Sequence, residues 1–408
     1  MASSNKRKII NDPVFGFINI PDDFLFEIIQ HPYFQRLNRI KQLGLSSFVY
    51  PGAQHTRQLH SLGAMHLMGE AIRQLRLQGQ DITPEEENAA LSAILLHDIG
   101  HGPFSHVLEH SLVKGVRHEE ISLWLMNRIN RETGGSLDLT LKIFTGQYPK
   151  KFLHQLVSGQ LDMDRLDYLS RDSFFCGVSE GMVGSARIIK MLDVRDDQLV
   201  VEAKGIYSIE KFLVARRLMY WQVYLHKTSA GAEKLLVNIL QRAKELAASG
   251  KELFSPPALH YFLYNEITKD DFLKSPEALD YFAMLDDSDI LCAVKAWADN
   301  PDLTLSTLCR AFIDRKLYKL DTRSDISAGE KRDSYTRLYM ERFGVSRQEA
   351  QYFMGEKIVS TDTYNSKDDS INILYKDGRI LDISLASDML NIDVLTKKAE
   401  KHFFYYFK

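Results

Sequence analysis

A histidine and an aspartate stand side by side where an apolar run of this chain ends. The residues Ala89–Leu96 predict a buried helix, and His97 and Asp98 follow it directly. Segment 100–103 then supplies two glycines and a proline, so the helix cannot continue. A polar pair at the end of a buried helix costs free energy unless a partner satisfies it. Imidazole and carboxylate groups are common ligands of divalent metal ions, so we expect this pair to form part of a metal site.

The composition is that of a soluble globular protein. The chain has 408 residues, of which 45% are hydrophobic and 26% charged, enough for two or three domains or one large helical domain with additions. A formal net charge of −3 argues against a protein that works on nucleic acid or on an anionic membrane. No apolar run approaches the roughly 18 residues of a membrane span, and the polar N-terminus lacks the apolar core of a signal peptide.

The number and spacing of the cysteines indicate the redox state of the cellular compartment. Cys176, Cys292 and Cys309 are scattered along the chain and form no CxxC pair. An odd number of isolated cysteines favours a reducing environment without a disulfide framework. We therefore expect a cytoplasmic protein with no membrane partner and no nucleic-acid partner.

Hydrophobic periodicity predicts a mainly α-helical chain. A helix is expected over 57–77, and the next begins at Thr83–Glu86, which is a strong helix-start signal. Residues 150–172 and 206–248 are each predicted to be one helical stretch. Residues 8–20 are expected to form a short hairpin around a turn.

The predicted secondary structure changes towards the C-terminal end of the chain, where strands appear beside helices. Ser346–Glu349 is a capping-box pattern that predicts a helix over 346–354. The predicted strands of this part of the chain are 357–362, 371–375 and 380–383, with a hairpin turn at 376–378. We infer a helical body over residues 1–320, with a metal core at about 45–230, and a small mixed α/β region over 321–408 that serves assembly or regulation.

Three predicted helices carry residues that suit one metal ion. His60 lies on the first turn of its helix, His97 and Asp98 end the next, and Asp164 lies in an aspartate-rich segment. Two imidazoles and two carboxylates can close around a hard-to-borderline divalent ion and leave positions for water and phosphate oxygens. The alternative is that His97 and Asp98 merely end a helix and that Asp164 is a surface charge.

This arrangement resembles a known family. The order His60, His97-Asp98, Asp164 is similar to the metal signature of the HD-domain phosphohydrolases. One branch of that superfamily contains the dNTP triphosphohydrolases of the SAM-and-HD-domain type and their bacterial relatives. The segments that resemble this branch are 50–63, 97–106, 117–119, 164–172 and 224–227. The resemblance runs from about Lys8 to Lys227, and we expect a relative that lacks the SAM domain.

The resemblance implies a mainly α HD-domain body and hydrolysis of a deoxynucleoside triphosphate (dNTP) to deoxynucleoside and inorganic triphosphate. A divalent ion would be bound by His60, His97, Asp98 and Asp164, and Mg, Mn, Fe, Zn and Ni are not distinguished. The implied catalytic residues are His101 and His118, with Glu119 orienting His118. The implied substrate contacts are Gln42, Leu43, Arg57, Arg165 (a lysine in the family), Tyr168, Asp172, Arg216, Tyr224, His226 and Lys227.

The physical chemistry of these residues agrees with those roles. Phosphoryl-type transfer needs positioning and charge neutralisation, which Arg57, Arg165 and Lys227 can supply. A histidine near its pKa can protonate a departing 5′-oxygen, and His118 is our choice for that acid. Asp164, Tyr168 and Asp172 are spaced by four residues and share one helix face, which would align metal, phosphate and sugar.

The resemblance also implies a homo-oligomer, dimeric or tetrameric, with an allosteric nucleotide as a further partner. Segment 8–13 resembles part of the allosteric site between subunits, but Gln30 and Asn38 replace an acidic and a basic residue of the guanine-activated members. Two alternatives stay open for the function. One is hydrolysis of another nucleotide phosphate ester, such as a monophosphate or an alarmone; the other is a nucleotide-binding regulatory module with little turnover.

Overall fold

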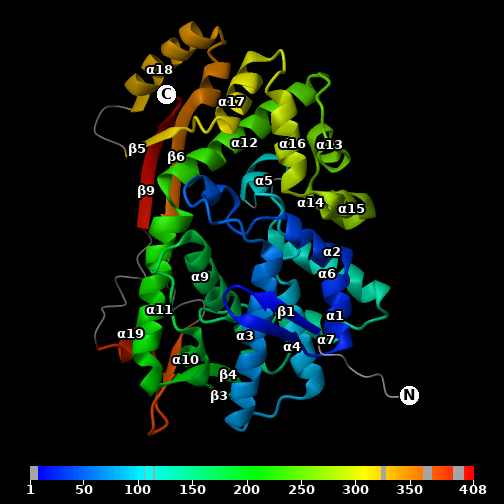
Figure 1. Cartoon of the computed structure of the whole chain (residues 1–408), viewed down its shortest axis with the longest axis vertical. Coiled ribbons are helices and arrows are strands. Elements are labelled where there is room, and N and C mark those ends of the chain that lie inside the picture. The colour runs from blue at the N-terminus through cyan, green and yellow to red at the C-terminus, as the bar shows by residue number, and fades with distance from the viewer. Residues whose placement is uncertain (1–7, 105, 114, 323–327, 362–369, 389–398) are drawn as a thin grey trace.

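The computed structural model describes residues 8–104, 106–113, 115–322, 328–361, 370–388 and 399–408. They form a mainly helical molecule with small sheets, which confirms the predicted fold class (Figure 1). Within the described residues, no helix combines the length and the apolar character needed to cross a bilayer. Cys176, Cys292 and Cys309 are free thiols.

Three packed helices form the centre of the helical body. Helix α3 (Arg57–Leu77) packs against α4 (Pro84–Leu96) and against α9 (Met163–Cys176). The capping box at the start of α4 is present, because the Thr83 side chain accepts from Glu86 N and the Glu86 side chain accepts from Thr83 N. The segment Ala89–Leu96 is at most 5% exposed, so the polar residues that follow α4 begin inside the molecule. Both predicted helix boundaries, 57–77 and the start at Thr83–Pro84, are confirmed.

The other α-helices of the described residues lie outside this centre. On the N-terminal side they are α1 (Asp23–Gln30), α2 (Pro32–Gln35), α5 (His106–Ser111), α6 (His118–Glu132), α7 (Asp138–Phe144), α8 (Lys151–Val157) and α10 (Ser185–Lys190). Towards the C-terminal end they are α11 (Ile206–Met219), α12 (Lys227–Ala248), α13 (Pro257–Tyr264), α14 (Lys269–Lys274), α15 (Pro276–Met284), α16 (Asp287–Trp297), α17 (Leu303–Ile313), α18 (Ala328–Phe343) and α19 (Ile383–Ala386). Figure 1 shows the long helix α12 running between the central helices and the strands of the C-terminal region.

Two stretches predicted as single helices are divided. Residues 150–172 split into α8 and α9, because Asp162 adopts an extended conformation and caps α9 by accepting from Arg165 N at 2.7 Å. Residues 206–248 split into α11 and α12, with a π-helical turn at Tyr220–Tyr224 between them. His226 then caps α12, since its Nδ1 accepts from Thr228 N at 3.2 Å.

The strands form three small sheets. Strands β1 (Lys8–Asp12) and β2 (Gly16–Ile20) make the predicted N-terminal hairpin, which lies over α3 in Figure 1. The four-stranded sheet has the order β3 (Leu192–Arg195), β4 (Gln198–Glu202), β7 (Asn372–Leu374) and β8 (Ile380–Asp382). The three-stranded sheet has the order β5 (Lys319–Thr322), β9 (Ala399–Tyr406) and β6 (Met354–Thr361).

The C-terminal region is joined to the helical body through these sheets. Strand β7 runs parallel to β4 and pairs Asn372 with Val200 and Leu374 with Glu202. The β7–β8 hairpin and its turn confirm the predicted strands there. Helix α18 was not anticipated, and the helix predicted over 346–354 is a short 3-10 turn, Glu349–Phe353, that leads into β6. The boundary near residue 320 stays a prediction.

Candidate metal centre and substrate cleft

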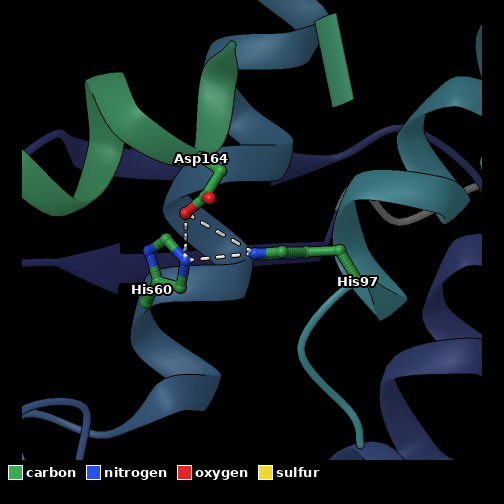
Figure 2. Close-up of side chains that lie close together, drawn as sticks. All are labelled: His60, His97 and Asp164. Atoms are coloured by element: carbon green, nitrogen blue, oxygen red, sulfur yellow. Dashed lines mark hydrogen bonds and ion pairs between the residues drawn. The ribbon is translucent and has the colours of Figure 1, made fainter. Parts of the chain in front are cut away.

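Three side chains from three helices converge on one point. His60 comes from the first turn of α3, His97 from the end of α4 and Asp164 from the first turn of α9 (Figure 2). His60 Nε2 lies 3.1 Å from Asp164 Oδ1 and 3.3 Å from His97 Nε2. His97 Nε2 lies 3.6 Å from the same Asp164 oxygen. The three ligand atoms all fall within 4.8 Å of one another, which is the arrangement of a group that could hold a metal ion.

Asp98 borders this cluster. Its Oδ1 lies 3.3 Å from His97 Nε2, and its Oδ2 lies 3.9 Å from His60 Nε2. Arg57 donates from Nη1 to Asp98 Oδ2 at 2.5 Å. Asp98 Oδ2 is therefore held by a guanidinium, while Oδ1 faces His97.

The outer nitrogens of both imidazoles have acceptors. His60 Nδ1 donates to Asp167 Oδ2 at 2.7 Å, and His97 Nδ1 donates to the carbonyl of Ile94 at 2.6 Å. These partners assign the proton of each neutral ring to Nδ1 and leave the Nε2 lone pairs directed at each other. Two lone pairs 3.3 Å apart need a shared cation or a proton between them. The donor set, two Nε2 atoms and carboxylate oxygens, fits a divalent ion.

The electrostatics of the cluster favour positive charge. Burial lowers the pKa of His60, but its hydrogen bonds with Asp164 and Asp167 outweigh burial and raise this pKa to about 10. Burial would raise the pKa of Asp98, but the surrounding imidazole and guanidinium groups hold it well below its usual value. The site therefore retains protons on nitrogen and none on oxygen, and a metal ion would replace those protons.

The cluster opens into a cleft of about 440 Å³. This volume is within the range of sites that hold small molecules. The sequence-predicted residues that line it are Gln42, Leu43, Arg57, Asp98, His101, His118, Asp164, Tyr168, Asp172 and Tyr224. Residues far apart in the chain thus meet around one cavity, next to the metal-ligand group.

Two histidines stack at one side of the cleft. The rings of His101 and His118 lie 3.8 Å apart between centroids and are nearly parallel, at 19°. His101 Nε2 is 3.4 Å from Asp98 Oδ1, and His118 Nε2 is 3.6 Å from Glu119 Oε1. Burial and the charge of Arg57 lower the pKa of His101 to about 3, so this imidazole is neutral at neutral pH.

The opposite wall contains a buried carboxylate and aromatic rings. Asp172 Oδ1 accepts from His55 Nε2 at 2.7 Å, and Asp172 Oδ2 accepts from the Tyr224 hydroxyl at 2.9 Å. The Tyr168 and Tyr224 rings meet edge to face at 5.9 Å. A carboxylate has about four acceptor positions, so Asp172 keeps capacity for a ligand hydroxyl. His55, for which no site role was predicted, orients this carboxylate.

Five residues predicted to be catalytic or to contact the substrate lie outside the set that lines the cleft. Arg165 turns back to Asp162 and the carbonyl of Gly159, and Arg216 donates to Gln160 Oε1 at 3.0 Å. The others are Glu119, beside His118, His226, which caps α12, and the exposed Lys227. Their contacts with substrate stay predictions.

The cleft also depends on residues that the sequence did not indicate, among them Asp287 and Tyr220. Asp287, at the start of α16, accepts from Lys41 N at 3.0 Å and from Phe104 N at 3.2 Å, next to two segments that line the cleft. Phe104 has a φ of 51°, a conformation that is costly for a residue with a side chain. The pattern of aspartates at 286–289 signals a helix start, but no neighbouring residue indicates a contact with Lys41 or Phe104. Tyr220 reaches the cleft from the π-helical turn, which has no sequence signal either.

Comparisons with known proteins agree with this geometry. A family model described as the HD domain matches residues 57–141, and one described as the HD associated region matches residues 183–255. An uncharacterised protein of Bacillus subtilis, YwfO, is 31% identical to this chain and is aligned over 98% of this chain and 92% of its own length.

Solved and characterised relatives extend the comparison. The crystal structure of a phosphohydrolase from Bacteroides thetaiotaomicron superposes with a TM-score of 0.96 at 58% identity, covering 99% of this chain and 100% of the other. The SAMHD1 homologue of Dictyostelium discoideum, named a deoxynucleoside triphosphate triphosphohydrolase, is 30% identical over 68% of this chain. The alignment spans only 57% of that relative's length.

Proposed function

The chain belongs to the HD-domain phosphohydrolase family, and we propose that it hydrolyses dNTPs to deoxynucleoside and inorganic triphosphate. One observation carries the proposal: Asp164, a member of the His60–His97–Asp164 group, lines the same cleft as Tyr168 and Asp172. That arrangement suits a substrate with a metal-binding phosphate chain at one end and a sugar at the other.

The phosphate end of the substrate would lie beside the metal ligands. A divalent ion held by His60, His97, Asp98 and Asp164 would polarise a phosphoryl oxygen and lower the pKa of a nearby water. Arg57 lines the same cleft beside Asp98, and its guanidinium would neutralise phosphate charge. The metal identity is left to experiment, since imidazole and carboxylate ligands suit several divalent ions.

The two stacked histidines would handle the leaving group. His118 is the partly exposed member of the pair, with 25% of its side chain accessible, and can exchange protons with solvent. We assign it the general acid that protonates the 5′-oxygen, with Glu119 orienting it. His101 is neutral and buried, and would donate a hydrogen bond or stabilise charge without itself changing protonation state.

The sugar would pack against the opposite wall. Asp172 is buried and already fixed by His55 and Tyr224, so its remaining lone pairs are directed without loss of side-chain entropy. A 3′-hydroxyl is the substrate group that fits such an acceptor. Tyr168, Gln42 and Leu43 would complete the sugar and base contacts.

We also propose that the protein is a homo-oligomer, dimeric or tetrameric. The outward face of the N-terminal hairpin carries Ile9 and Phe17, which are 55% and 68% exposed. Apolar residues on an exposed two-stranded hairpin are typical of surfaces covered by another chain. An allosteric nucleotide at such a contact stays a prediction.

The test is incubation with each dNTP and either Mg²⁺ or Mn²⁺, with products separated by anion exchange. We expect deoxynucleoside and triphosphate, and slower turnover of the matching ribonucleotides. Monophosphate plus pyrophosphate would contradict the proposal. Orthophosphate release from nucleoside monophosphates, without dNTP turnover, would favour the alternative phosphate-ester hydrolase. Nucleotide binding without any turnover would favour a regulatory module.

A further inference from the structure

A continuous line of charge-assisted hydrogen bonds runs from the metal-ligand group to the N-terminal hairpin. His60 Nδ1 donates to Asp167 Oδ2 at 2.7 Å. Asp167 accepts from Arg171 at both oxygens, at 3.0 Å from Nε and 3.0 Å from Nη2. Arg171 Nη1 then donates to Asp12 Oδ2 at 2.7 Å. The side chains of these four residues are at most 1% exposed.

Asp12 also fixes the turn of the hairpin. Its Oδ1 accepts from Val14 N at 2.9 Å and from Phe15 N at 2.8 Å. The Phe15 ring lies 5.6 Å from the Arg171 guanidinium, within the range of a cation–π contact. The two oxygens of one carboxylate therefore bind the hairpin turn and the guanidinium that supports Asp167.

Helix α3 leaves space for this line at one position. A Cβ atom on Gly63 would overlap Asp167 Oδ1 and Arg171 Nη2. His60 and Gly63 lie three residues apart on the same helix, so the backbone that carries the metal ligand also makes room for its support. The close packing of Asp167 and Arg171 against Gly63 is therefore a second observation, separate from the hydrogen-bond distances.

We propose that Asp12 is a positioning residue of the metal centre, which acts through Arg171 and Asp167 to hold His60 Nε2 in the orientation that metal binding requires. The inference rests on the metal site proposed above but not on the identity of the substrate. Without the Asp12 acceptor, the Arg171 guanidinium loses one of the hydrogen bonds that fix its orientation. Its two hydrogen bonds with Asp167 then become less well aligned. The carboxylate of Asp12 also balances the charge of Arg171, so that Asp167 keeps its attraction for the His60 N–H.

The test is the affinity of the full-length protein for Mn²⁺, measured by isothermal titration calorimetry after bound metal has been removed with a chelator. Asp12→Asn keeps an acceptor for the hairpin turn but removes the charge, and it should weaken Mn²⁺ binding about tenfold. The matched control is Asp23→Asn, which removes an exposed ion pair with Lys8 of the same hairpin and should leave the affinity unchanged.

Two further variants separate positioning from general destabilisation. Arg171→Lys keeps the charge but loses the forked geometry, so it should weaken Mn²⁺ binding to a similar extent. On an Asp167→Asn background, Asp12→Asn should cause no additional loss, because the line is already broken. Thermal unfolding of the metal-free proteins checks that each variant is folded.

The outcomes distinguish this inference from the proposed function. Unchanged Mn²⁺ affinity in folded Asp12→Asn, or equal losses on both backgrounds, would overturn the inference. Absence of Mn²⁺ binding by the unaltered protein would overturn the metal site and the inference together. The expected affinities without dNTP hydrolysis would support the inference and overturn the proposed substrate.

Discussion

His60 Nε2 and His97 Nε2 lie 3.3 Å apart, although they come from different helices and each ring has an acceptor for its other nitrogen. Two neutral imidazoles arranged in this way repel one another through their lone pairs. The nearby Asp164 oxygen, 3.1 Å from His60 Nε2, adds negative charge at the same point. These groups would therefore repel one another without a proton or a metal ion between them, and packing of α3, α4 and α9 supplies the restraint that keeps them together.

This relationship predicts that metal binding stabilises the protein. At about 100 times the dissociation constant, a ligand that binds only the folded state adds about 2.7 kcal/mol, or a rise in Tm of about 3 °C for a chain of this size. Thermal unfolding of chelator-treated protein with and without Mn²⁺ measures this rise in Tm. Because binding must displace a proton from His60, whose pKa the hydrogen bonds with Asp164 and Asp167 raise to about 10, the gain should increase as pH rises.

Asp164→Asn is the control for that measurement. It preserves the shape of the side chain but removes the charge that faces both imidazoles, and we expect neither a Tm gain with Mn²⁺ nor turnover of substrate. A variant that stays active and metal-stabilised would mean that Asp164 is not a ligand.

Local signals in the sequence were sufficient to predict α3 and α4, which carry His60 and His97. The Thr83–Glu86 capping box and the glycines after His97 fix the ends of α4, and these signals depend on neighbouring residues alone. The break between α8 and α9 was missed, because a helical hydrophobic pattern continues across Asp162 while its side chain caps the second helix. Hydrophobic periodicity indicates which face of a segment is buried, but it does not indicate whether the helix is interrupted within that segment.

The contacts that complete the cleft depend on packing between distant segments. Asp287 reaches Lys41 and Phe104 across 246 and 183 residues of chain. The parallel pairing of β7 with β4 is equally remote from any local pattern. Such contacts are set by how the helices and strands assemble, which one sequence does not report.

Asp287 should make stability depend on pH. Burial raises its pKa to about 6, although hydrogen bonds from Lys41 N and Phe104 N oppose the shift. The folded protein then holds a proton that the unfolded chain releases near pH 4, so this residue's contribution to the free energy of unfolding falls as pH rises from about 4 to about 6 and is constant above that. The change is about 3 kcal/mol.

Asp287→Asn removes this titration. Relative to the unaltered protein, the variant should gain stability between about pH 4 and pH 7, measured by urea denaturation at both ends of that range. A difference between the two proteins that does not change with pH would contradict the assignment. Because an amide oxygen replaces only one of the two carboxylate acceptors, the variant should also raise KM through looser packing of the Phe104 segment.

Tyr224→Phe should weaken substrate binding without abolishing catalysis. The change removes the hydroxyl that donates to Asp172 at 2.9 Å, and leaves His55 as the remaining donor. Hydrogen bonds to charged groups contribute about 1.5–3 kcal/mol, so we expect KM to rise about tenfold with kcat nearly unchanged. Tyr220→Phe, which removes another hydroxyl from the same cleft and leaves both Asp172 bonds in place, is the control. A fall in kcat alone would contradict a role in binding the sugar.

Two glycines of helix α3 should respond to alanine with opposite signs. At Gly63 a Cβ atom would overlap Asp167 and Arg171, both buried in ion pairs, so Gly63→Ala should lower the free energy of unfolding by about 1–3 kcal/mol. At Gly69 the nearest atom to a new Cβ is Leu91 Cδ2, at 3.8 Å, an ordinary contact. Gly69→Ala should therefore raise stability by up to about 1 kcal/mol, because alanine is the better helix former. Denaturant unfolding of both variants without metal measures the difference, and shifts of the same sign would mean that Gly63 is not needed to accommodate the Asp167–Arg171 pair.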